Sequence, residues 1–131
     1  MVRQDIDIDG YWKVIVFYNL DYGLFHIIYK VLKAIGFTDA HIRRIYNMLK
    51  SGKAKAVTCS NPLYHISIIL LTPHPFIPDF ISSVVHEAEH VKQAMLEAYD
   101  VEDEGEPPAY TIGYIVMRMY GVFKTFIFRN H

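Results

Sequence analysis

The chain has 131 residues, of which 52% are hydrophobic and 15% aromatic, so it can bury a core and is too apolar to be disordered. Its formal net charge of -1 gives no overall field that would attract nucleic acid or an anionic membrane. The single cysteine, Cys59, excludes an internal disulfide, and we expect one domain over residues 1–131 in the cytoplasm.

The N-terminal third of the chain predicts a strand and then a helix. Residues 1–10 alternate aspartate with isoleucine and form a polar lead-in with weak strand character. Residues 11–18 are rich in β-branched and aromatic residues, which favours the first strand. Apolar residues at helical spacing predict the first helix over residues 22–35, and Gly36 stands where a helix-ending glycine belongs.

A second helix and a hairpin are predicted next. Thr38 or Asp39 can cap a helix that ends near residue 50, because one face of this segment is apolar at helical spacing. Residues 54–59 and 64–72 then predict two strands, since each is apolar and the loop between them has turn chemistry. Together these two strands form a hairpin.

The last part of the chain predicts two helices separated by an acidic loop. A stiff, proline-rich segment leads to Asp79, a candidate N-cap for a long helix over residues 79–99. Residues 101–108 form the acidic loop, and its two final prolines suit the first turn of a C-terminal helix over residues 106–126.

These elements predict an α+β fold with a small, mostly antiparallel three-stranded sheet packed by helices on one side. Edge strands of such a sheet remain open to an extended peptide. We expect no membrane span: prolines and histidines interrupt the uncharged segment 61–78, and Arg118 and Lys124 interrupt the apolar C-terminal stretch.

A candidate metal site lies in the middle of the long predicted helix. Residues 86–90 read His-Glu-Ala-Glu-His, and a spacing of four residues places His86 and His90 on one helix face within reach of a single ion. Catalytic zinc usually takes three protein ligands and keeps a fourth position for water. The helical wheel leaves open whether Glu87 or Glu89 faces such an ion, because the two flank the histidine pair symmetrically.

Acidic residues are concentrated around this motif. Between Glu87 and Glu106 there are eight acidic residues and one basic residue, Lys92, whereas the rest of the chain has six acidic and twelve basic residues. This distribution suits a cation site, although a solvated helix end and loop would give the same pattern.

The HEAEH segment, followed by an acidic loop and by residues 106–110 (EPPAY), resembles minimal zincins of the gluzincin type. More narrowly, it resembles small metallopeptidases encoded by tailed bacteriophages, whose pattern joins HExxH to a downstream acidic residue and an Ala-Tyr pair. The resemblance covers about the last third of the chain. It implies a zincin-like fold, Zn²⁺ as cofactor, and a location in the host cytoplasm or with the virion.

The resemblance also assigns roles to individual residues. It makes His86 and His90 zinc ligands, Glu106 the third ligand and Glu87 the general base. Glu89 would then face solvent or contact the zinc ligands without binding the ion itself. Tyr110 would donate a hydrogen bond to the tetrahedral intermediate or orient Glu106. Because the segment from His90 to Glu106 is short, three other acidic residues remain rival third ligands: Glu102, Asp103 and Glu104.

The sequence therefore predicts a zinc-dependent metallopeptidase that hydrolyses a peptide or protein substrate with zinc-activated water. The alternative is a catalytically inactive, zincin-like structural or interaction protein of a phage or mobile element. A third alternative is an α+β module that binds no metal. A homo-oligomer or a complex with a virion protein is compatible with all three.

Overall fold

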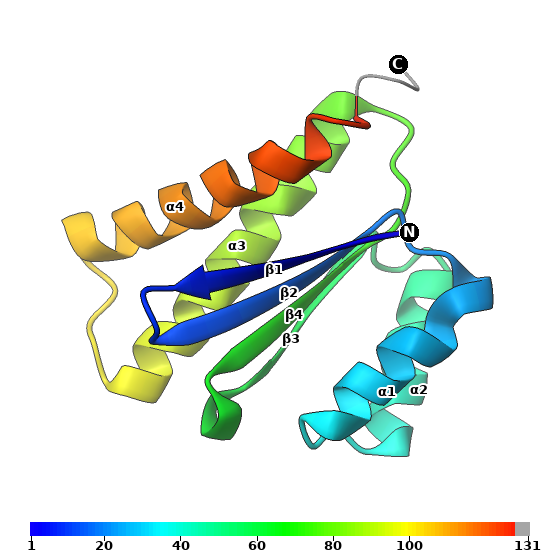
Figure 1. Ribbon diagram of the computed structural model, residues 1–131, viewed down its shortest axis with the longest axis horizontal. Helices are drawn as coiled ribbons and strands as arrows, with labels where there is room; N and C mark the ends of the chain where they lie inside the picture. Colours follow the sequence, from blue (N-terminus) through cyan, green and yellow to red (C-terminus); the bar gives the residue numbers. More distant parts are fainter. Residues whose placement is uncertain (128–131) are drawn as a thin grey trace.

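The computed structural model describes residues 1–127, which form one four-stranded sheet with two helices on each face (Figure 1). Two short 3₁₀ turns, Tyr22–Leu24 and Pro62–Tyr64, complete the fold. The strands are β1 (Val2–Ile8), β2 (Trp12–Tyr18), β3 (Ala56–Asn61) and β4 (Ile66–Leu71). The helices are α1 (Phe25–Ala34), α2 (Asp39–Lys50), α3 (Ile77–Tyr99) and α4 (Glu106–Phe123).

The sheet is mixed, with strand order β1-β2-β4-β3. β1 pairs with β2 and β3 pairs with β4 in antiparallel fashion, whereas β2 and β4 are parallel. The predicted α+β class and the predicted hairpin are confirmed. The prediction of three strands covered on one side was wrong, because the polar lead-in forms an edge strand and helices cover both faces.

The two central strands explain why both faces are covered. In β4 all six residues are buried, and in β2 all but one are buried. Alternate residues of these strands enter different cores: Ile69 and Leu71 pack with α3 and α4, whereas Ile68 and Leu70 pack with α1 and α2. A strand that is apolar on both faces requires a layer of helices on each side.

The residues that begin and end the helices are partly those that the sequence predicts. The hydroxyl of Thr38 accepts a hydrogen bond from the backbone N–H of His41 and caps α2, and Gly36 has a φ of +98° after α1. Asp79 is not the cap of α3, because this helix begins two residues earlier, at Ile77, and Pro78 occupies its first turn. The C-terminal helix ends at Phe123 rather than at 126.

The long helix α3 packs one apolar stripe against the sheet and α4. Phe80, Val84, Ala88 and Val91 recur at helical spacing and are buried in the same core as Ile115 of α4. The turn containing His86 and His90 is thus held on a rigid element beside the edge strand β3. Among residues 1–127, no helix is both long enough and apolar enough to cross a membrane.

Candidate metal site

A cleft of about 580 Å³ opens between α3 and the edge strand β3. Half of the residues that line the cleft are alanine, serine or threonine, and their small side chains leave it open. The motif residues His86, Glu87 and His90 lie on its α3 wall. The other lining residues are Met48, Ala54, Lys55, Ala56, Val57, Thr58, Ser60, Ser82 and Ser83.

The two motif histidines point at the same spot in this cleft. Their Nε2 atoms are 3.1 Å apart, and their rings lie nearly perpendicular with centroids separated by 4.6 Å. Both side chains are exposed, so an ion can reach them from solvent. The arrangement follows from the helix itself, which brings residues four apart onto one face.

The spacing of the two nitrogens fits zinc. Two imidazole nitrogens bound to a tetrahedral Zn²⁺ at about 2.05 Å lie about 3.3 Å apart. The Nε2 atoms of His86 and His90 are within a few tenths of an ångström of this separation. A hydrogen bond between two neutral imidazoles gives a similar distance, so the geometry accommodates both the free pair and the ion.

Glu87 and Glu89 occupy different environments, which the helical wheel did not distinguish. Glu87 is 4% exposed, and its Oε1 accepts a hydrogen bond of 3.0 Å from the hydroxyl of Thr58 on β3. It therefore lies between helix and strand, at the floor of the cleft. Glu87, unlike Glu89, lines the same cleft as the two histidines, and its role as general base stays a prediction.

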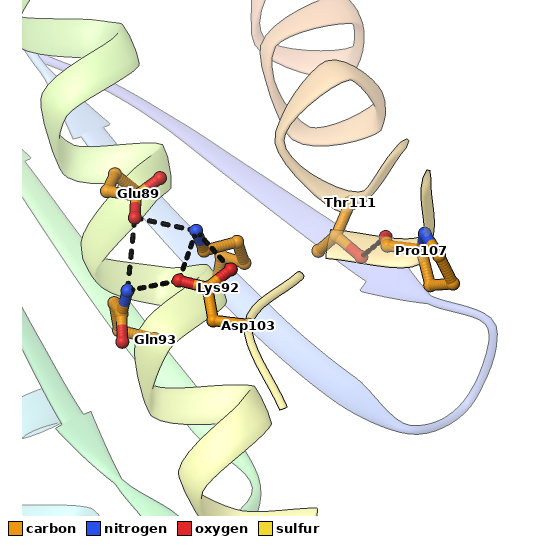
Figure 2. Close-up of polar contacts among 6 residues, drawn as sticks. All are labelled: Glu89, Lys92, Gln93, Asp103, Pro107 and Thr111. Carbon is orange, nitrogen blue, oxygen red and sulfur yellow. Dashed lines mark hydrogen bonds and ion pairs between the residues drawn. The ribbon is translucent and has the colours of Figure 1, made fainter. Parts of the chain in front are cut away.

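Glu89 belongs to a separate polar cluster beside the motif (Figure 2). Lys92 Nζ lies 2.6 Å from Glu89 and 2.9 Å from Asp103, and Gln93 donates hydrogen bonds to both carboxylates. The bond from Lys92 is the main cause that lowers the pKa of Glu89. Lys92 is 5% exposed, so a buried cation fixes the acidic loop to α3.

The remaining predicted site residues lie elsewhere. Glu106 is the first residue of α4 and is exposed, and Tyr110, one turn later, is 70% exposed. Among residues 1–127, no three His, Cys, Asp or Glu side chains come close enough to hold one ion together. The structure thus brings His86, Glu87 and His90 together without Glu106, and the identity of a third ligand remains a prediction.

Of the rival ligands in the acidic loop, Asp103 is engaged by Lys92 and Gln93. Glu102 and Glu104 are exposed, like Glu106. The loop therefore reaches α3 through Asp103, which faces Lys92 and Gln93 (Figure 2).

Two residues that line the cleft, Thr58 and Ser83, were not predicted as site residues, and His74 is bonded to one of them. Thr58 holds Glu87, and Ser83 binds His74, which lies on the loop before α3. Burial lowers the pKa of His74 below its usual value of 6.5. A signal for His74 was its position in a stiff proline-rich segment that enters the motif helix directly. Nothing in the local sequence marks Thr58.

Comparisons of the chain with family models, with curated proteins and with solved structures each found no match.

Proposed function

We propose that the cleft between α3 and β3 is the active site of a zinc-dependent peptidase. The main support is the geometry of the cleft. The Nε2 atoms of His86 and His90 are 3.1 Å apart there, and the buried carboxylate of Glu87 lines the same cleft. In this proposal His86 and His90 hold Zn²⁺, with Glu106 or another carboxylate as the third ligand. Bound zinc would lower the pKa of a water molecule to near neutrality.

Glu87 would then act as the general base of the hydrolysis. Thr58 engages Oε1 of Glu87, which leaves Oε2 to take a proton from the attacking water and to pass it to the leaving amine. Glu87 is held from β3 and lines the same cleft as both histidines, so its position does not depend on the substrate. A fixed carboxylate of this kind would suit a general base.

The edge strand suits an extended peptide as substrate. β3 pairs with β4 on one side only, so its other edge presents free backbone N–H and C=O groups along the cleft. A peptide strand added there would pass in front of His86 and Glu87, which lie on the opposite wall. We infer that substrate recognition is largely through the main chain.

A matched pair of variants tests this function. Glu87→Gln should lower cleavage of a peptide library by about 100-fold or more while zinc content is unchanged. Glu89→Gln makes the same chemical change two residues away, outside the cleft lining, and should cleave at close to the unmutated rate. Cleavage that survives Glu87→Gln, or that persists after zinc is removed with a chelator, would contradict the proposal.

A second candidate function is an interaction protein that keeps this fold without hydrolysis. The observation that favours it is that the described residues bring two histidines and no third ligand to one point. Absence of any cleavage by the unmutated, zinc-loaded protein would support this candidate over the peptidase.

A further inference from the structure

Ser83, which lines the same cleft, forms a pair with His74 that the proposed hydrolysis does not use. His74 Nε2 lies 2.8 Å from the hydroxyl oxygen of Ser83, and His74 Nδ1 lies 2.6 Å from the carbonyl oxygen of Thr72. Ser83 lines the cleft on α3, one turn before His86. Both distances are within the reach expected of a nucleophile, its base and the group that orients the base.

The hydrogen bonds fix where the protons are. A backbone carbonyl can only accept, so Nδ1 of His74 carries a proton and donates it to Thr72. Burial keeps the pKa of His74 below 6.5, so the ring is neutral near pH 7 and Nε2 has a free lone pair. The hydroxyl of Ser83 must therefore donate to Nε2, which is the arrangement that activates a serine.

The imidazole of His74 is also held in place by packing. The ring of Phe80, the first buried residue of α3, meets it edge-on with centroids 5.4 Å apart. The charged groups closest to it are Lys55 and Asp79, which form an exposed ion pair of 3.5 Å with each other. The base is therefore oriented by a carbonyl and an aromatic ring, and no carboxylate binds it directly.

We propose that Ser83 is a nucleophile and His74 its general base, and that this pair accepts acyl groups from carboxylic esters without a metal. The oxygen of Ser83 would bond to the carbonyl carbon as its proton moves to His74 Nε2. The alkoxide would leave with that proton and give an acyl-serine and an alcohol. Water would then add to the acyl carbon as His74 takes its proton, and the bond from that carbon to Ser83 would break, with the proton returning to Ser83 and a carboxylic acid released.

Two other residues of the cleft bear on this proposal, Lys55 and Ser82. Lys55 also lines the cleft, and its ammonium group would offer positive charge to a carbonyl oxygen that becomes negative there. Ser82, the residue before Ser83, also lines the cleft, but its hydroxyl has no bond to His74. Ser82 is therefore a matched control on the same wall.

The test uses an alkyl fluorophosphonate, a reagent that phosphonylates activated serines and releases fluoride. With metal removed by a chelator, intact mass and peptide mapping should show one phosphonyl group per chain, on Ser83. Ser83→Ala should abolish labelling, and His74→Gln should slow it by about 100-fold or more. Ser82→Ala should label at the unmutated rate, and labelling in the absence of metal separates this site from the proposed peptidase.

A second variant keeps the test valid if Ser83→Ala unfolds. Ser83→Cys retains a nucleophile, and a thiol beside His74 should react with iodoacetamide about tenfold faster than the same thiol in the Ser83→Cys, His74→Gln double variant. The native Cys59 does not interfere, because burial raises its pKa to about 12. No labelling of the unmutated protein, labelling of Ser82, or a rate that His74→Gln leaves unchanged would overturn the proposal.

Discussion

The two faces of the sheet differ in the polarity of what they bury. On the α1 and α2 face, the buried core is composed of apolar side chains, among them Ile28, Leu32 and Ile68. On the α3 and α4 face lie Ser67, Glu87 and Lys92, the three polar side chains that are buried within residues 1–127. Both faces thus have an apolar core, and the α3 and α4 face also buries polar side chains.

Each buried polar group on the second face is matched by partners. Ser67 bonds with Trp12 and Ser60, Glu87 with Thr58, and Lys92 with two carboxylates. Within the described residues, every fully buried side-chain nitrogen or oxygen has a hydrogen-bond partner. Both faces therefore contribute apolar packing, and the α3 and α4 face also holds polar groups whose burial is costly unless they are hydrogen-bonded.

The strongest test of this division removes an apolar side chain from the α1 face. Ile28→Ala should lower the free energy of unfolding by about 2–5 kcal/mol, because Ile28 is fully buried and its loss leaves a cavity. Zinc affinity of the remaining folded protein should not change. Denaturant unfolding and calorimetric titration measure the two quantities, and a large loss of zinc affinity would show that the faces are coupled.

A smaller effect is expected from the support of Glu87. Thr58→Val keeps the shape of the side chain but removes the donor to a buried carboxylate oxygen, which should cost about 1–3 kcal/mol. Thr58→Ser retains the hydroxyl and serves as the control. Equal unfolding free energies for the valine and serine variants would mean that Thr58 does not hold Glu87.

The smallest effect concerns pH and His74. Since burial lowers the pKa of His74 in the folded state, its proton binds more tightly when the chain is unfolded. The stability that the neutral ring contributes is present above pH 6.5 and is lost as pH falls through the folded pKa. Asp79 opposes the shift and Lys55 reinforces it.

His74→Gln should therefore flatten the fall in stability of the protein between about pH 7 and pH 5, as followed by denaturant unfolding. Asp79→Asn provides a control, because it changes a charge near the ring without removing the ring. Identical pH profiles for the unmutated protein and His74→Gln would contradict the assigned protonation of this histidine.

Much of the fold was predictable from local sequence patterns. The errors in the predicted fold have a physical cause. Helical periodicity and capping residues located all four helices to within a few residues. β1 was missed as a strand because alternating aspartates face solvent, and only Ile6 and Ile8 enter the core. The continuous apolar runs of β2 and β4 are typical of strands buried on both faces, and the prediction of helices on one side did not use this signal.

The candidate site was predictable where its geometry is local. His86, Glu87 and His90 meet because they lie within two turns of one helix, and sequence spacing alone specifies that. The position of the acidic loop depends instead on the long-range contacts of Lys92 with Asp103, which no pattern revealed. The same holds for Thr58, whose partner is 29 residues away along the chain.

Zinc binding decides whether α3 holds a metal site on its face of the sheet. Elemental analysis and calorimetric titration of the purified protein should give one zinc per chain. The double variant His86→Ala, His90→Ala should lose this zinc while remaining folded, and His41→Ala, on α2 at the opposite face, should keep it. A protein that binds no zinc, or a double variant that binds it as tightly as the unmutated chain, would contradict the account.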